Sequence, residues 1–245
     1  MLVKIYQGGY MKNFGLKSIG LAVLLSGNLM ALNIADTPHG GIVGGSVNDN
    51  NQICVYCHTP HAGRNNLGPI PLWNKPATNL ELTNGFTMYG ASSTNTEGET
   101  IAGTKTAVQP QSQTLACLSC HDGVSAMNSV INAPGSGLVN PVDGTLIGTP
   151  NDGRTMYDFA FLAVGLGGDL TDDHPLSIEY IPGRASLKPL DTILTNSFGA
   201  NKISDLLRNG KVECVSCHDP HGTGNPRYLR TNNTQSALCL NCHDK

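Results

Sequence analysis

A five-residue pattern, Cys-x-x-Cys-His, occurs four times in this chain and uses all of its cysteines, which total 8. The copies span residues 54–58, 117–121, 214–218 and 239–243. Repeated Cys-x-x-Cys also fits tetrahedral zinc sites, and an even number of cysteines also fits disulfides. A histidine after every copy argues against both, because a chain with only 8 histidines among 245 residues would not place four of them there by chance.

This pattern is the attachment sequence of c-type haem. Two cysteines one short turn apart can form thioethers with two vinyl groups of one porphyrin, and the next histidine is the proximal ligand of the iron. We therefore expect four covalently attached haem c groups. The tethers are Cys54, Cys57, Cys117, Cys120, Cys214, Cys217, Cys239 and Cys242, and the proximal ligands are His58, His121, His218 and His243.

The remaining histidines match the number of irons that need a sixth ligand. Beyond the proximal four, the chain contains His39, His61, His174 and His221. A lone histidine is more often a hydrogen-bonded or exposed side chain, but the matching number favours His/His coordination at every iron. Methionine at one iron is the alternative, supplied by Met88, Met127 or Met156.

Two of these candidates follow a proximal histidine by three residues, in His-x-Pro-His segments ending at His61 and His221. So short a segment cannot pass around a porphyrin, and proline makes it extended, so each must serve another haem. We expect His61 to serve the haem at His121, and His221 the haem at His243. His174 is then available to the first or third haem. His39 lies on a glycine-rich arm that can reach a haem of its own chain or of a neighbour.

The chain repeats itself in two haem-pair modules. Each contains CVxCHxPH followed by CLxCHD, with a long loop between the two motifs in the first module and a short one in the second. We expect a first module with a flexible amino-terminal arm at 36–122, a loop-rich segment carrying His174 at 123–213, and a second module at 214–245.

The expected fold is mostly irregular, with few short helices and strands and a core made of haem. Aromatic residues make up 5 % of the chain, against 29 glycines and 14 prolines, so porphyrins must replace much of the usual apolar core. A short helix is predicted at 201–209, ended by Gly210. An apolar buried strand or strip is predicted at 158–164. Surface loops are predicted at 92–106 and 132–152.

The first 35 residues have the pattern of an export signal. A basic start at Met11, the expected initiator, precedes an apolar run that is shorter than the roughly 20 residues of a membrane span. Cleavage is expected after Ala31 or Ala35, which leaves no membrane span. Because the net charge is −3, nucleic acid is not an expected partner.

The chain resembles multihaem cytochromes with doubled Cys-x-x-Cys-His modules, and among them the tetrahaem outer-surface cytochromes that form filaments, called nanowires. The resemblance depends on the four motifs, the two His-x-Pro-His segments, residues 71–75 (PLWNK) and residues 174–177 (HPLS). It implies stacked haems, His/His coordination throughout, and one ligand supplied across a subunit interface. That ligand would be His39.

Three functions follow as hypotheses. The first is an extracellular filament that carries electrons over long distances, with copies of itself, redox proteins or extracellular acceptors as partners. The second is a monomeric periplasmic electron carrier in which His39 binds its own chain's haem. The third is a multihaem reductase, which needs an open coordination position at an iron. Four spare histidines leave no such vacancy, so we expect no enzyme.

Overall fold

The computed structural model describes residues 37, 39, 53–65, 67, 70–127, 129–133, 145–146, 163–195, 199–222 and 224–244. All of them belong to one compact unit, Asn33–Lys245. The predicted export segment at 1–35 lies outside the described residues. Within the described residues, no helix is long and apolar enough to cross a membrane.

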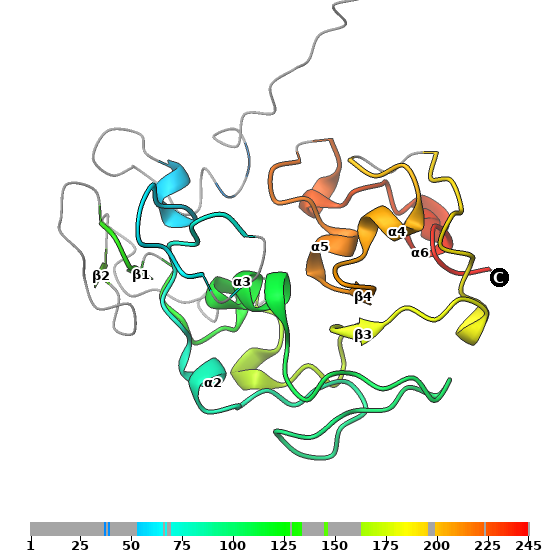
Figure 1. The fold of residues 1–245 in the computed structure, drawn as a ribbon, viewed down its shortest axis with the longest axis horizontal. Coiled ribbons are helices and arrows are strands. Elements are labelled where there is room, and N and C mark those ends of the chain that lie inside the picture. The colour runs from blue at the N-terminus through cyan, green and yellow to red at the C-terminus, as the bar shows by residue number, and fades with distance from the viewer. Residues whose placement is uncertain are drawn as a thin grey trace, which may run out of the picture. The chain divides into compact units, whose positions relative to one another are not determined.

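Regular structure is sparse, as the composition predicts (Figure 1). Within the described residues the longest helix is α3 (Ser112–His121). The other α-helices of the described residues are single turns: α2 (Asn79–Leu82), α4 (Ile203–Leu206), α5 (Cys214–Cys217) and α6 (Ala237–Leu240). The 3-10 turns are η3 (Ile53–Tyr56), η5 (Leu166–Gly168), η6 (Arg184–Ser186), η7 (Pro226–Tyr228) and η8 (Thr234–Ser236).

Four two-residue strands form two antiparallel pairs. β1 (Ser129–Val130) pairs with β2 (Thr145–Leu146), and β3 (Ile178–Glu179) pairs with β4 (Lys211–Val212). The strand β2 lies in the segment 132–152, so the prediction of a loop there is wrong at these two residues. A strand of two residues is too short to show the alternation by which strands are recognised in a sequence.

The predicted helix at 201–209 is confirmed in place but is shorter. The Asp205 carboxylate accepts hydrogen bonds from the backbone N–H groups of Asn201 and Lys202, which fixes the start of α4. The helix ends at Leu206 because the next residue is extended, and Asn209 and Gly210 then turn the chain with φ of 51° and 75°. Of the predicted apolar strip at 158–164, residues 158–162 lie outside the described residues.

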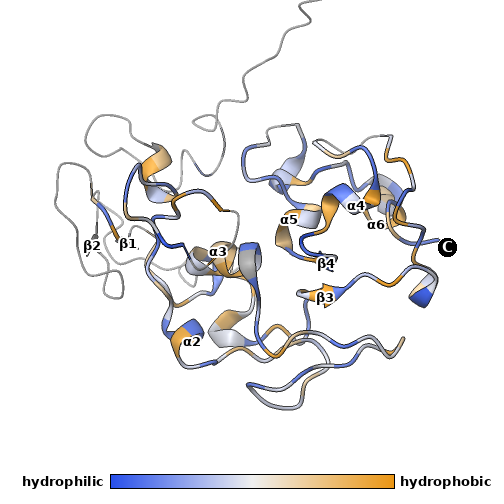
Figure 2. Cartoon of the chain, in the orientation of Figure 1, coloured by the Kyte–Doolittle hydropathy of each residue, from blue (hydrophilic) through white to orange (hydrophobic). Residues whose placement is uncertain are grey.

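The apolar core of the described residues consists of two small clusters. One contains Tyr180, Leu194, Ala200, Ile203 and Leu206, and the other contains Phe86, Met88, Leu118 and Leu170. Figure 2 shows hydrophobic residues in short stretches rather than in one continuous layer. Such clusters are small for a domain of this length, which agrees with a core completed by a large apolar cofactor.

Candidate haem-binding sites

Each Cys-x-x-Cys-His motif lies on a helical turn. In three copies the N–H of the histidine donates to the carbonyl of the first cysteine, at 2.7 Å for His58, 3.0 Å for His218 and 2.9 Å for His243. The fourth copy forms the end of α3, and the carboxylate of Asp122, the residue after the helix, accepts the N–H groups of Val124 and Ser125 in the turn that follows. The turn brings both cysteines to one side, as attachment to one porphyrin requires.

The three motifs outside α3 share a further element, which we call the proximal strap. The straps are residues 71–74, 185–188 and 227–230. The third strap residue forms an antiparallel bridge to the proximal histidine, pairing Trp73 with His58, Leu187 with His243 and Leu229 with His218. The fourth strap residue donates its N–H to the carbonyl of the second cysteine, at 2.8–2.9 Å in all three copies.

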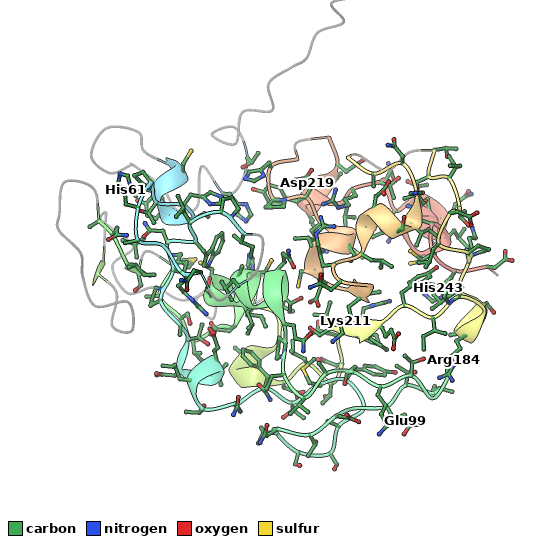
Figure 3. The ribbon with its side chains drawn as sticks, viewed as in Figure 1. His61, Glu99, Arg184, Lys211, Asp219 and His243 are labelled. Carbon is green, nitrogen blue, oxygen red and sulfur yellow. The ribbon has the colours of Figure 1, made fainter. Side chains whose placement is uncertain are left out.

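The first strap residue orients the imidazole. Its carbonyl lies 2.8 Å from Nδ1 of His58 at Pro71, 2.9 Å from Nδ1 of His218 at Arg227, and 3.3 Å from Nδ1 of His243 at Ala185. Figure 3 shows His243 beside the turn that carries Arg184. A carbonyl at Nδ1 selects the tautomer with the proton there, which leaves Nε2 free for a metal.

The fourth strap residue also holds the motif with its side chain. Asn74 Nδ2 donates to the carbonyl of Val55, and Arg230 Nε donates to that of Val215, each at 2.6 Å. Lys188 Nζ donates to the carbonyl of Leu240, also at 2.6 Å. These three carbonyls belong to the same motif position, directly after the first cysteine, so three different side chains perform one structural task.

Two pairs of imidazoles have the separation that an iron between them requires. The ring centroids of His39 and His121 are 6.3 Å apart, and those of His58 and His221 are 6.2 Å apart. Metal–imidazole bonds of about 2.0 Å on both sides of one metal place the centroids about 6.3 Å apart. The two pairs therefore fit His/His coordination of haem iron.

His39 is held in place by the second half of the chain. Its N–H donates to the hydroxyl of Tyr228, and its ring stacks on the Tyr228 ring with centroids 4.3 Å apart. Desolvation, with the nearby His121 and His221 as smaller causes, lowers the pKa of His39 to about 4. His39 is thus neutral at neutral pH, which is the form that binds a metal.

His174 lies near His243, whereas no histidine among the described residues faces His61 or His218. Desolvation and the neighbouring His243 lower the pKa of His174, against the raising effect of its hydrogen bond to the Pro175 carbonyl. His61 is exposed, and Figure 3 shows it near the first haem-binding turn. Among the ring contacts of the described residues, neither His61 nor His218 faces another histidine.

The rings that the structure brings together differ from the pairing predicted from the sequence. His121 faces His39 rather than His61, and His221 faces His58 rather than His243. The backbone at His61 explains the difference, because its carbonyl accepts hydrogen bonds from Thr59 Oγ1 and Asn132 Nδ2, which fixes the segment at the surface. His39, which the resemblance assigns as a ligand for a neighbouring subunit, lies against its own chain.

Of the alternative methionine ligands, Met88 and Met127 are buried, with Met88 in an apolar cluster, and Met156 lies outside the described residues.

The attachment cysteines of different motifs lie close together. The Cys117 thiol hydrogen-bonds to the sulfur of Cys214, which raises the pKa of Cys117 and lowers that of Cys214. Cys57 interacts electrostatically with Cys120, and Cys217 with Cys242. Where haem is attached these thiols are thioether sulfurs, so the hydrogen bond places the attachment points of the second and third motifs side by side, and the electrostatic interactions place the others within range of each other.

A buried carboxylate joins the second and third motifs. The hydroxyls of Thr114, on α3, and Ser177, before β3, both donate to Glu213 Oε2. Thr114 Oγ1 also accepts the N–H of Cys214, the first residue of α5. Burial raises the pKa of Glu213, and the two hydroxyls oppose that rise.

Sequence reasoning missed the straps and this carboxylate. The segment 71–75 was noted only as part of a resemblance, and nothing marked 185–188 or 227–230. A sequence signal exists in hindsight: Trp73-Asn74, Leu187-Lys188 and Leu229-Arg230 are each a large apolar residue followed by a side chain with an N–H donor. Two residues are too weak a pattern to find without the structure.

A family model described as the doubled CXXCH motif matches residues 207–245, which contain α5, α6 and the last two haem-binding motifs. No curated protein is similar enough to the chain to count as a match. The doubled motif indicates covalently bound haem c with iron, in a multihaem c-type cytochrome that transfers electrons.

Proposed function

We propose that this chain is a tetrahaem cytochrome that conducts electrons through four closely spaced His/His-coordinated irons, and that exported copies join into extracellular filaments. Each bound haem supplies an iron that passes between Fe³⁺ and Fe²⁺ with one electron. The cysteines tether the group, the straps orient three proximal imidazoles, and His39, His174 and His221 supply distal imidazoles.

The adjacency of the attachment cysteines is the observation that carries this proposal. A thiol hydrogen bond links Cys117 to Cys214, and electrostatic interactions link Cys57 to Cys120 and Cys217 to Cys242, so the interactions run through the four motifs in sequence order. A protein that carries electrons between cofactors needs those cofactors close together. A reductase would instead need a substrate position at one iron, and the supply of distal imidazoles argues against one.

The supply of distal imidazoles also supports association of copies. Among the described residues, three proximal histidines have a distal candidate nearby, whereas no described histidine faces His218 or the exposed His61. The iron at His218 needs a distal ligand and His61 needs an iron, so both needs are met if His61 of one copy binds the iron at His218 of the next. Such a contact is head-to-tail, and a head-to-tail contact whose rotation does not close produces a filament.

Two measurements test the proposal on protein matured with haem. Mass spectrometry of the intact chain should give four haem c groups, and a smaller number would contradict the tetrahaem assignment. Electron microscopy should then show filaments for the wild type and single-chain particles for His61→Ala. His174→Ala is the matched control, because it also removes an exposed distal histidine but should still form filaments. Filaments of His61→Ala, or a wild type without filaments, would refute the role of His61.

A monomeric periplasmic carrier is the second candidate, and the position of His39 favours it. This residue lies against His121 of its own chain, as expected for a carrier that completes its ligands internally. In a monomer, His61 would have to reach His218 in the same chain. Single particles for the wild type, with all four haems low-spin, would establish this alternative.

A further inference from the structure

Contacts from one short segment of the second haem-pair module, residues 220–228, hold His39 in place. The hydroxyl of Tyr228 accepts the His39 N–H, and the two rings stack with centroids 4.3 Å apart and planes 17° apart. The carbonyl of Pro220 lies 3.4 Å from Nδ1 of the same imidazole. These contacts act on the backbone, the ring face and Nδ1 of His39, so they fix the orientation of the imidazole and leave Nε2 for a metal.

The sequence around His39 does not by itself fix the position of this residue. The segment that joins His39 to the first attachment cysteine, Cys54, contains glycines at 40, 41, 44 and 45. Glycine restricts the backbone less than any other residue, so this sequence leaves many positions open to the imidazole. Ordering such a segment costs free energy when the ligand binds. Contacts that already hold His39 beside the iron therefore strengthen its coordination.

The strap that carries Tyr228 imposes an uncommon backbone conformation on this residue. Tyr228 is the second residue of the strap 227–230 and has a φ of 58°, in the left-handed region that bulky residues rarely adopt. The second residues of the other two straps, Leu72 and Ser186, have φ of 47° and 58°. In all three straps the carbonyl of this residue accepts the N–H of the residue after the proximal histidine, at 2.7–2.9 Å. The strap thus requires the backbone conformation whatever the side chain.

The side chain of Tyr228 is not explained by the strap. The corresponding side chains, those of Leu72 and Ser186, are exposed, so neither a ring nor a hydroxyl is needed at this strap position. Tyr228 is half-buried, and its ring and its hydroxyl both contact His39. The contact with His39 is therefore the feature that distinguishes this strap from the other two.

We propose that Tyr228 is a positioning residue that holds His39 at the iron of the His121 haem, so that the strap of one haem-binding motif controls the sixth coordination position of another. The proposal rests on the tetrahaem function, with His39 as a distal ligand. The rings of His39 and His121 already have the separation of ligands to one iron. Arg227, directly before Tyr228, places its carbonyl 2.9 Å from Nδ1 of His218. Adjacent residues of one strap thus serve the proximal ligand of one haem and the distal ligand of a second.

The first test compares carbon monoxide binding by the reduced, haem-loaded protein with that of variants at Tyr228. Tyr228→Asn removes the ring, and because asparagine adopts the left-handed conformation readily, the strap should stay intact. Carbon monoxide and His39 compete for one iron, so weaker positioning of His39 should raise the affinity for carbon monoxide there. Loss of a ring stack and a hydrogen bond predicts a rise of about tenfold or more. Tyr228→Phe loses the hydroxyl alone, so its rise should be smaller, about fivefold.

Electron paramagnetic resonance of the ferric protein gives a second readout. The ring planes of His39 and His121 are 62° apart, whereas those of His58 and His221 are 26° apart. The angle between two axial imidazole planes sets the anisotropy of the low-spin ferric signal, so the two haems should give different signals. Tyr228→Asn should change the signal of the His121 haem and leave that of the His58 haem as it is. A change in both signals, or in neither, would overturn the proposal.

A double variant tests whether Tyr228 acts through His39. His39→Ala should bind one more carbon monoxide per chain than the wild type, and adding Tyr228→Asn should change neither the number bound nor the affinity. An additional site in the double variant, or loss of a haem from Tyr228→Asn in mass spectrometry, would assign Tyr228 to the strap alone and overturn the proposal. An unchanged affinity in Tyr228→Asn would do the same. If His39→Ala itself binds no carbon monoxide, the assignment of His39 as a distal ligand fails as well, so the two failures are distinguishable.

Discussion

Replacing Thr114 by valine should destabilise the haem-loaded protein by about 2.5–4 kcal/mol. Valine has nearly the same shape but no hydroxyl. Two interactions disappear: the bond donated to the buried Glu213 carboxylate, and the bond accepted from the Cys214 N–H at 3.2 Å. A hydrogen bond to a charged group contributes about 1.5–3 kcal/mol and one between neutral groups about 1 kcal/mol. Thr114 is 0 % exposed and Glu213 is 2 % exposed, so water cannot replace either bond without opening the contact between α3 and α5.

The free energy of unfolding can be measured by guanidinium titration at neutral pH, followed by circular dichroism, with reversibility checked by dilution. Thr114→Ser is the matched control, since it keeps the hydroxyl and should cost less than half as much. A double-mutant cycle with Glu213→Gln isolates the coupling between the two side chains. A loss below about 0.5 kcal/mol in Thr114→Val, or an equal loss in Thr114→Ser, would refute the reasoning.

Three further predictions concern single side chains. Because burial raises the pKa of Glu213, the folded protein binds the proton of this carboxyl more tightly than the unfolded chain does. The contribution of Glu213 to stability should therefore fall as pH rises from about 4.3 through the folded pKa. Glu213→Gln should remove this part of the stability–pH curve, and a curve parallel to that of the wild type would contradict the prediction. His39→Ala should leave the haem at His121 five-coordinate, so that the reduced protein binds carbon monoxide at one haem. Absence of carbon monoxide binding would mean that a ligand other than His39 coordinates this iron. A Cβ on Gly63 would lie 2.5 Å from the backbone carbonyl carbon of Leu72, so Gly63→Ala should displace the first strap and lower the midpoint of thermal unfolding. Gly224→Ala is the control, because a Cβ there meets open space and should leave the midpoint unchanged. Equal midpoints for the two variants would argue against the close approach at Gly63.

Much of the site follows from the sequence because haem attachment is a local reaction. Five consecutive residues contain both thioether positions and the proximal ligand, and one helical turn is enough to bring them together. The low aromatic content and the many glycines and prolines likewise predict a coil-rich chain with a small apolar core. These statements require no knowledge of which distant segments meet.

The sequence by itself therefore determined where haem is attached, which histidines are available as ligands, and that regular structure is sparse. The tertiary structure alone decided which imidazole faces which, because those pairs join segments far apart in the chain. His39 is positioned by Tyr228, 189 residues away, and His243 by a strap carbonyl 58 residues away. The tertiary structure also decided the Glu213 contact, whose hydroxyl donors lie far from it in the chain, and the straps, whose hydrogen bonds go mostly to backbone carbonyls. Every residue has a backbone carbonyl, and every residue except proline has a backbone N–H, so the partners of these groups become visible only when the chain is folded.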